Sequence, residues 1–358
     1  MENKLTLLVD GNWLLMSRLF FISDKFGKNK PEAVKEAAKE ELQDILARSI
    51  SIMLSKHQII DNLIIVADNG SWRKELPIPK QLEDITYKGN RETQQEIDWD
   101  CIYESFNEFL RHVGATGVTV SQGNGIEGDD WVWYWTRRLN EEGINTMIWT
   151  SDCDLKQLVQ VHNQAFTAWY NDKSGLVLPI ECQTPQDPLD FFLNPPFNND
   201  VLITLTRPLS LSVNYINPDE IVMNKILCGD NSDNIKSIVR FRKNNKNYGF
   251  TQKDYEKLIT EVKVDSMPEF LKNDDGVIEG ILSNKKFKDH HFNPEDIREM
   301  LKYNTKLVWL NENIIPQTVI TKMASAEYKV FNVKDIRLNY RILTPSKIDI
   351  ESIFNDAF

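Results

Sequence analysis

Five short apolar segments, separated by stretches of helical composition, most constrain the fold of this chain. They span residues 5–10, 62–68, 117–122, 145–152 and 165–171, and their Val, Ile and Leu content is typical of buried strands. Residues 31–56, 98–112 and 127–143 are helical in composition, and a further helix is expected from Asp154 onward. Strands that alternate with helices predict an α/β protein whose central sheet is mostly parallel and flanked by helices.

Composition excludes several classes of protein. No apolar segment approaches the roughly 20 residues that span a bilayer, and the first residues lack the pattern of a signal peptide. The four cysteines form no C-x-x-C pair, so neither a disulfide framework nor a zinc site is expected. We therefore expect a cytoplasmic protein that does not bind membranes.

Charge is unevenly distributed along the chain. The formal net charge of −11 argues mildly against nucleic-acid binding, because phosphate-binding proteins are usually basic. Residues 235–258 nevertheless carry seven basic side chains against two acidic ones. Such a run forms either a solvated face or a contact surface for phosphates, and the run alone does not decide between them.

A change of composition predicts the domain organisation. Residues 183–218 are rich in Pro, Asn and Asp and are interpreted as an insertion or linker, with a β segment at 201–206. The chain beyond is more polar and helical. We expect a first domain over residues 1–182, the linker over 183–218, and a helical region over 219–358.

Acidic residues follow three of the predicted strands. Asp10, Asp68 and the pair Asp152 and Asp154 come where strands end, and carboxyl ends of parallel strands share one edge of a sheet. Further acids lie at a helix start and later in the chain: Glu127, Asp129, Asp130, Asp230 and Asp233. Each alone is ordinarily a cap or turn residue, but their convergence requires another explanation.

Bound cations explain such a cluster best. Two carboxylates about 4 Å apart repel by roughly 4 kcal/mol at an effective dielectric near 20. The ligands are oxygens without a His or Cys set, which favours Mg²⁺, with Mn²⁺ as a substitute, over Zn²⁺. More than six carboxylates predict two ions, an arrangement suited to phosphodiester hydrolysis.

The acidic motifs resemble those of a known family. The chain contains, in order, VDGN, VAD, YKGNR, EGDD, SDCDLKQL and GDNSDNI. This series resembles the structure-specific 5′-nucleases, a family that includes flap endonucleases, and is most similar to the ribonuclease H (5′–3′ exonuclease) of T-even phages. The resemblance covers residues 5–240. It implies a PIN-like nuclease core, a helical arch within residues 72–98, and a helix–hairpin–helix-like region at the C-terminal side.

The resemblance also implies roles for individual residues. Asp10, Asp68, Glu127 and Asp129 would hold or support the first ion, with Asp130 outside them. Asp152 and Asp154 would lie between the ions and act in catalysis, and Asp230 and Asp233 would lie on the second-ion side. Lys88, with Arg91 as its partner, would place and polarise the scissile phosphate. The implied nucleic-acid contacts are Arg73, Lys74, Tyr87 (by stacking on a terminal base), Lys88, Arg91, Lys236, Arg240, Arg242, Lys243 and Lys246.

Two departures from the family pattern limit the comparison. Cys153 stands where the family usually has Gly, which tolerates conformations that Cys does not. After SDNI the family has a glycine-rich hairpin, whereas here the first glycine is Gly249, so backbone coordination of K⁺ is not expected. Trp131 and Trp135, four residues apart, are expected to pack in the core.

The function implied is that of a magnesium-dependent 5′–3′ nuclease. Its substrates would be DNA and RNA–DNA duplexes with 5′ ends, flaps or RNA primers, and it would act as a monomer in replication and repair, in the host cytoplasm if viral. A single-strand-binding protein and a sliding clamp are candidate partners, the clamp through residues 348–358 unless these pack or fray.

Three other readings are weaker. A haloacid-dehalogenase-type phosphatase needs an Asp where Asn12 stands. A flap-binding protein without catalysis would have lost the acids. A PIN-type nuclease would be shorter and would lack the basic helical region.

Overall fold

The central sheet is mostly parallel, as the sequence predicted. The computed structural model describes residues 5–26, 41–82, 85–89, 98–183, 199–206, 212–244 and 246–344. Its main sheet has the order β3-β2-β1-β4-β6-β7-β8, with β5 paired to β6. The strands are β1 (Leu5–Asp10), β2 (Asn62–Val66), β3 (Thr119–Ser121), β4 (Asn145–Trp149), β5 (Gln160–His162), β6 (Ala165–Asn171), β7 (Gly175–Pro179) and β8 (Val213–Ile216). From β3 to β6 all neighbours along this order are parallel, whereas β7 and β5 run antiparallel to β6.

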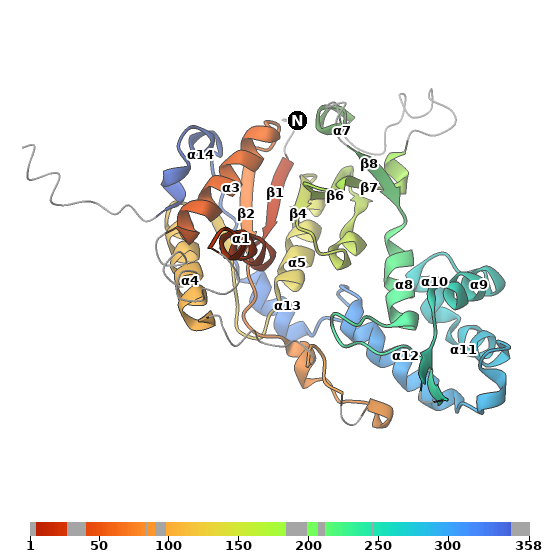
Figure 1. Ribbon diagram of the computed structural model, residues 1–358. Helices are drawn as coiled ribbons and strands as arrows, with labels where there is room; N and C mark the ends of the chain where they lie inside the picture. The colour runs from red at the N-terminus through yellow and green to blue at the C-terminus, as the bar shows by residue number, and fades with distance from the viewer. Residues whose placement is uncertain are drawn as a thin grey trace, which may run out of the picture.

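Helices cover both faces of this sheet (Figure 1). Helices α1 (Gly11–Phe26), α3 (Leu42–Lys56) and α4 (Trp99–Ala115) pack on one face, and α5 (Gly128–Glu141) and α13 (Gln317–Ala324) on the other. Strand β1 shows why: Leu7 contributes to the first layer and Leu8 to the second, and both are fully buried. Trp131 and Trp135 are buried in the second layer, which confirms their expected place in the core.

A second hydrophobic cluster forms mainly beyond residue 217, together with Leu82 and Tyr87 of the arch segment. Its helices are α8 (Pro218–Cys228), α9 (Gln252–Val262), α10 (Met267–Lys272), α11 (Asp274–Ser283) and α12 (Pro294–Val308). Between α8 and α9 lies an antiparallel hairpin of β9 (Arg240–Lys243) and β10 (Lys246–Gly249), which the sequence analysis did not predict. Figure 1 shows these helices beside the sheet domain, with α8 leading into them.

Two predicted elements are wrong in type. The helix expected from Asp154 is only a 3₁₀ turn, η3 (Asp154–Leu158), before the chain enters β5. Within this turn Leu155 and Leu158 are both buried, and the Gln157 side chain exchanges hydrogen bonds with the backbone of residues 308 and 310. Residues 199–206 form helix α7 (Asn199–Thr206) instead of a β segment.

The region from residue 219 onward does not behave as one unit. After Leu310 the chain returns to the sheet domain, where α14 (Lys334–Leu338) and η6 (Tyr340–Leu343) pack against α3. Val333, Ile336 and Leu343 are buried in the sheet cluster, and Arg337 Nε donates to the carbonyl of Leu54 at 2.9 Å. The expected single region 219–358 is therefore corrected. Its segment from α14 to η6 packs into the core that lies between the sheet and helices α1, α3 and α4. The sequence could not reveal this, because short amphipathic segments do not specify their partner.

Some expectations concern residues outside the described ranges. These are residues 31–40 of the helix expected over 31–56, residues 83, 84 and 90–97 of the arch segment, with Arg91, residues 184–198 and 207–211 of the linker, the side chain of Lys243, and the tail at 348–358. The described part of the arch segment contains two 3₁₀ turns, η1 (Trp72–Glu75) and η2 (Lys80–Leu82). Across the described part of the chain, no helix is both long and apolar enough to cross a lipid bilayer.

The packing of α14 predicts a contrast between two of its residues. Ile336 is fully buried, whereas Leu338 of the same helix is 87% exposed. We expect Ile336→Ala to lower the free energy of unfolding by about 2–4 kcal/mol, through lost burial and a residual cavity. Leu338→Ala is the matched control and should change it by less than about 0.5 kcal/mol. Urea unfolding followed by circular dichroism measures both, and equal effects would contradict this placement of α14.

Candidate metal centre and nucleic-acid interface

The acids predicted from the sequence lie at one edge of the sheet. Asp10 is the last residue of β1. Asp68 follows β2 and Asp152 follows β4, and these two strands flank β1. Asp129 lies in the first turn of α5. Asp10 is close enough to Asp68 and Asp152 to be repelled by both, and Asp129 is repelled by Asp152 and Asp10. We call Asp10, Asp68, Asp129 and Asp152 the first acidic group.

Burial and repulsion raise the pKa of two acids of this group, Asp10 and Asp129. Burial, reinforced by the charges of Asp68 and Asp152, raises the pKa of Asp10 to about 7. Hydrogen bonds from the Trp13 N–H at 3.0 Å and from Thr150 Oγ1 at 2.9 Å only partly oppose this. Burial, followed by repulsion from Asp152, also raises the pKa of Asp129 well above its usual range. The group is therefore poorly neutralised by the protein alone.

A second acidic group lies beside the first. Asp154, Asp230 and Asp233 each present a carboxylate oxygen, and these oxygens lie within 4.8 Å of one another. Burial, with a smaller contribution from Asp152, raises the pKa of Asp154 to about 6. The two groups thus meet at Asp152 and Asp154, the pair that the sequence motif placed between two ions.

A tight turn brings Asp230 and Asp233 to this position. Gly229 ends α8 with φ of 78°, and an added Cβ would come within 2.5 Å of the Ile235 carbonyl oxygen. The backbones of Asp230 and Ile235 exchange hydrogen bonds of 2.8 and 2.7 Å, which closes the loop around Asp233. The glycine is thus required by this geometry.

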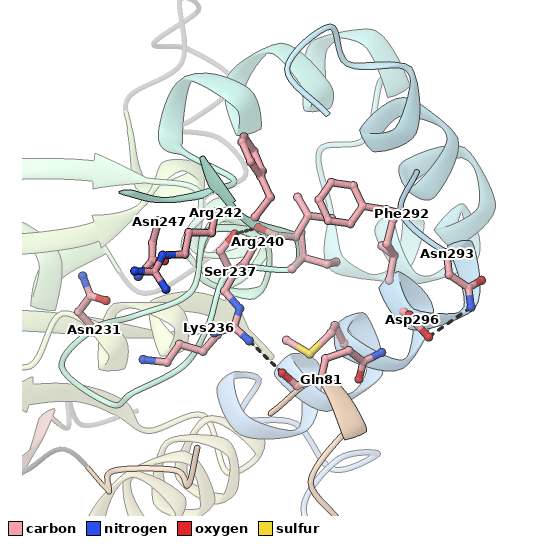
Figure 2. Close-up of a pocket in the computed structure, with 15 residues that line it drawn as sticks. Gln81, Asn231, Lys236, Ser237, Arg240, Arg242, Asn247, Phe292, Asn293 and Asp296 are labelled. Carbon is pink, nitrogen blue, oxygen red and sulfur yellow. Dashed lines mark hydrogen bonds between the residues drawn. The ribbon is translucent and has the colours of Figure 1, made fainter. Parts of the chain in front are cut away.

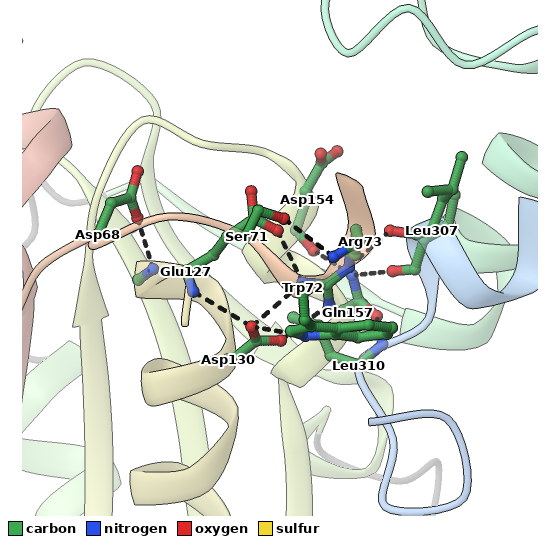
Figure 3. A network of polar contacts seen from close by, with 12 residues as sticks. Asp68, Ser71, Trp72, Arg73, Glu127, Asp130, Asp154, Gln157, Leu307 and Leu310 are labelled. Atoms are coloured by element: carbon green, nitrogen blue, oxygen red, sulfur yellow. Dashed lines mark hydrogen bonds and ion pairs between the residues drawn. The ribbon is translucent and has the colours of Figure 1, made fainter. Parts of the chain in front are cut away.

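A buried ionic network supports the edge of the first group (Figure 3). Arg73 is 2% exposed; it donates to Glu127 Oε2 at 2.7 Å, to Asp130 Oδ1 at 2.8 Å and to the carbonyl of Leu307 at 3.1 Å. Trp72 Nε1 donates to Asp130 at 3.0 Å. The expected phosphate contact of Arg73 is therefore corrected, because a guanidinium enclosed by protein partners does not face a ligand. Asp130 is fully buried and pairs with Arg73.

Lys88 and Tyr87 lie between the two acidic groups. The Lys88 ammonium pairs with Glu127, and its backbone N–H, at φ of 55°, donates to the Asp233 carbonyl at 2.9 Å. Tyr87 is 7% exposed, with its hydroxyl 3.4 Å from Asp233 Oδ2. Tyr87 thus packs in the second hydrophobic cluster, against the loop that carries Asp233. This corrects the expectation that it stacks on a base. Lys74 is exposed, as a phosphate contact must be.

The basic residues of the hairpin line a cavity (Figure 2). Its volume is about 640 Å³, and Lys236, Arg240 and Arg242 contribute to its lining. Arg240 Nη2 donates to the Gln81 carbonyl at 3.1 Å, which joins the hairpin to the arch segment. Lys246 is exposed on β10, outside the lining. Three of the predicted basic residues, Lys236, Arg240 and Arg242, therefore gather around one cavity.

Two residues of the site were not predicted from the sequence. Thr150 Oγ1 donates to Asp10 and accepts from the Asp152 N–H at 3.0 Å, so one hydroxyl links the acids of two strands. Lys225 of α8 pairs with both Asp154 and Asp230. For Lys225, the only signal in the sequence was a charged residue directly before the apolar residues 226–228. Neither Thr150 nor Lys225 belongs to an acidic motif.

Both acidic groups fit divalent cations. The donors are carboxylate oxygens only, and the acids of the first group are held together although their charges repel. Glu127 is already paired with Arg73 and Lys88, so it supports the first group through these cations. The residues that remain to hold ions are the first acidic group and the three acids of the second.

The role of Arg73 can be tested against its neighbour Lys74. We expect Arg73→Met to lower the free energy of unfolding by about 3–5 kcal/mol, because Glu127 and Asp130 would lose their buried partner. Lys74→Met, the control at an exposed position, should change it by less than about 0.5 kcal/mol. Urea unfolding in EDTA measures both, and a normal stability for Arg73→Met would refute the buried network.

The pKa of Asp10 predicts how pH acts on metal-free protein. Because this pKa of about 7 lies above the ordinary 3.8, the stability contributed by Asp10 is complete below about pH 4 and is lost as pH rises through 7. Mg²⁺ competes with the same protons. We therefore expect added Mg²⁺ to raise the thermal midpoint clearly at pH 8 and little at pH 5.5. Thermal unfolding with EDTA or Mg²⁺ measures this, and a larger Mg²⁺ effect at pH 5.5 would contradict it.

Solved structures with the same fold come from bacteriophage T5. The T5 D15 protein co-crystallised with metal ions aligns with a TM-score of 0.53 and 16% identity, over 94% of this chain and 99% of that one. A T5 D15 flap endonuclease variant in a complex with DNA and metal ions aligns with a TM-score of 0.51 and 15% identity, over 95% and 100%. The T5 5′-exonuclease with bound zinc aligns with a TM-score of 0.51 and 17% identity, over 94% and 99%. At these identities the likeness establishes the fold.

The family is established by sequence. No curated protein sequence gives a significant match to the chain. A family model does: residues 5–180 match the 5′–3′ exonuclease N-terminal, resolvase-like domain, the part that carries the parallel sheet and the first acidic group. Over residues 5–180 the chain thus belongs by sequence to the 5′–3′ exonuclease family, whose N-terminal domain it matches.

Proposed function

We propose that this protein is a magnesium-dependent 5′–3′ nuclease with a two-metal-ion site. It hydrolyses phosphodiester bonds at 5′ ends, flaps or RNA primers of duplex nucleic acid during replication and repair. The observation that carries the proposal is the convergence of acids from β1, β2, β4 and α5 beside a second acidic group. Such paired groups of oxygen ligands suit in-line displacement at phosphorus.

The two acidic groups supply the ligands for the ions. Asp10, Asp68, Asp129 and Asp152 would hold the first, and Asp154, Asp230 and Asp233 the second. When bound, the ions would activate the attacking water and stabilise the charge on the phosphate and leaving oxygen. Mg²⁺ is the physiological choice because all donors are hard oxygens, and Mn²⁺ would replace it.

The protein's own residues would position these acids and the substrate. Thr150 fixes the Asp10 carboxylate relative to Asp152, and Arg73 holds Glu127 in place. Lys88 is 13% exposed and pairs with Glu127, beside the acids of the first group. From there its ammonium would place and polarise the scissile phosphate once a substrate competes with Glu127 for it. This is the role that the resemblance implied for Lys88, with Glu127 added as its partner before a substrate binds.

The basic cavity would hold duplex nucleic acid. Lys236, Arg240 and Arg242 provide local positive charge in a chain whose net charge is −11. Contacts to phosphates depend on this local field more than on the total. The T5 flap endonuclease variant described above was crystallised with DNA, which supports DNA as the substrate here. Replication proteins are further candidate partners, and the enzyme would act as a monomer.

A phosphatase of the haloacid-dehalogenase type receives no support from this geometry. Such an enzyme would need a catalytic Asp at position 12. Asn12 stands there, and its Oδ1 accepts a hydrogen bond of 2.8 Å from the backbone N–H of Asp68. The amide therefore joins the start of α1 to the segment that follows β2 and has a structural role.

The proposal predicts the effect of removing one ligand of the first acidic group. Asp152→Asn should lower the cleavage rate about 100-fold or more, because an amide is a much weaker ligand for Mg²⁺. Its affinity for nucleic acid should stay normal or rise, since a negative charge facing phosphate is removed. Asp172→Asn, which alters an exposed acid paired with Lys56, is the control and should cleave normally.

The measurement uses a 5′-flapped duplex and an RNA-primed duplex, with product sizes read on a gel in Mg²⁺, in Mn²⁺ and in EDTA. Binding is titrated separately in Ca²⁺. Wild-type cleavage in Mg²⁺ or Mn²⁺ and none in EDTA is expected. Full cleavage in EDTA, or normal turnover by Asp152→Asn, would overturn the proposal, and the preferred duplex identifies the substrate class.

A further inference from the structure

An internal lysine occupies the second acidic group. The Lys225 ammonium pairs with Asp154 Oδ2 and lies 2.6 Å from Asp230 Oδ2. Its side chain is 11% exposed, compared with 27% for Asp154 and 22% for Asp230. Lys225 is thus more enclosed than either acid with which it pairs, and its charge is balanced by two of the three acids that could hold an ion.

The ammonium and a divalent cation would need the same oxygens. The ligand atoms of Asp154, Asp230 and Asp233 lie within 4.8 Å of one another, which is room for one cation. A cation placed there would meet the Lys225 charge at a few ångströms, where like charges repel strongly. Both cannot therefore occupy the group in the arrangement that the structure shows.

Space exists for the lysine to leave. A cavity of about 390 Å³ adjoins Lys225 and is lined by Asp154, Asp230, Glu220 and Asn224 among others. Glu220 is exposed and lines the same cavity, so it offers an alternative partner for the ammonium. The long, flexible lysine stem permits such a change without moving the helix.

The first acidic group differs in this respect. Its neighbouring ammonium, that of Lys88, pairs with Glu127, which is itself held by Arg73. Asp10, Asp129 and Asp152 instead lie close enough together for their charges to repel. A cation entering the first group therefore relieves repulsion, whereas one entering the second must first displace Lys225.

We propose that Lys225 is a built-in counter-cation of the second acidic group, and that a second divalent cation binds only when its ammonium withdraws from Asp154 and Asp230. The inference rests on the two-ion site of the proposed function. It makes the ions bind in order, the first group filling at low concentration and the second at a higher one. Lys225 thereby sets the metal concentration at which the site becomes complete.

The test is a titration with Mn²⁺ of wild-type protein and of Lys225→Met. Isothermal titration calorimetry and the electron paramagnetic resonance of free Mn²⁺ report binding without any need for cleavage. We expect the weaker step to tighten at least about tenfold in Lys225→Met, the effect of removing one close charge competitor. The tighter step should be unchanged. In EDTA the variant should also have a lower thermal midpoint, which Mn²⁺ restores, because Asp154 and Asp230 lose their partner.

Two further variants separate this role from simple structural support. Lys225→Arg keeps the charge, so its weaker step should stay as weak as in the wild type. Lys286→Met removes a lysine that pairs with Asp254 at 2.7 Å, away from both acidic groups. This control should lose stability without any change in either Mn²⁺ step. If Lys225→Met fails to fold by circular dichroism, Lys225→Gln takes its place in the titration.

The inference is overturned if the neutral variants bind the second Mn²⁺ no more tightly than wild type, or more weakly. The latter would mean that Lys225 organises the acids for the ion. This outcome is distinct from failure of the proposed function, which the flap-cleavage assay measures on wild-type protein. A wild type that does not cleave while Lys225→Met binds Mn²⁺ more tightly would refute the nuclease and keep the inference.

Discussion

Repulsion among carboxylates is the constraint on which the site of this protein depends. The first and second acidic groups lie side by side, and Asp152 and Asp154 belong to one each. Each close pair costs roughly 4 kcal/mol at an effective dielectric near 20, so the fold must supply positive charge or leave protons on the acids. The raised pKa of Asp10, about 7, shows that the described protein groups only partly meet this need. An affinity for divalent cations follows directly from that imbalance.

Three cationic side chains offset the repulsion in different ways. Arg73 forms a fixed network with Glu127 and Asp130, because a planar guanidinium matches carboxylates at several points and is never deprotonated. Lys88 and Lys225 each offer a single ammonium on a flexible stem. A metal ion can replace such an ammonium at a carboxylate, and the ammonium can instead pair with a phosphate. The arginine therefore serves the stability of the site, whereas the two lysines are suited to be displaced during its use.

The second hydrophobic cluster completes the site as well as the fold. Helix α8 brings Lys225 and, through Gly229, the loop that carries Asp230 and Asp233. The hairpin β9–β10 of the same cluster places Arg240 against the arch segment. The final helices then return to the sheet domain, so chain segments before and after this cluster share one core. The two acidic groups are held together because both ends of the cluster are anchored.

The sequence alone determined the class of fold, most strands of the parallel sheet and the edge where the acids meet. These follow from local patterns: a strand such as β1 is apolar throughout because both faces are covered, and a residue that follows it must lie at the carboxyl edge. Only the tertiary structure decided what neutralises the acids. Arg73 and Tyr87 are residue types that often contact nucleic acid, but both are buried here. Lys225 belongs to no recognised motif, yet it pairs with two acids. Burial and ion pairing depend on segments far apart in the chain, here residues 73, 127 and 307, and no local pattern encodes which of them will meet.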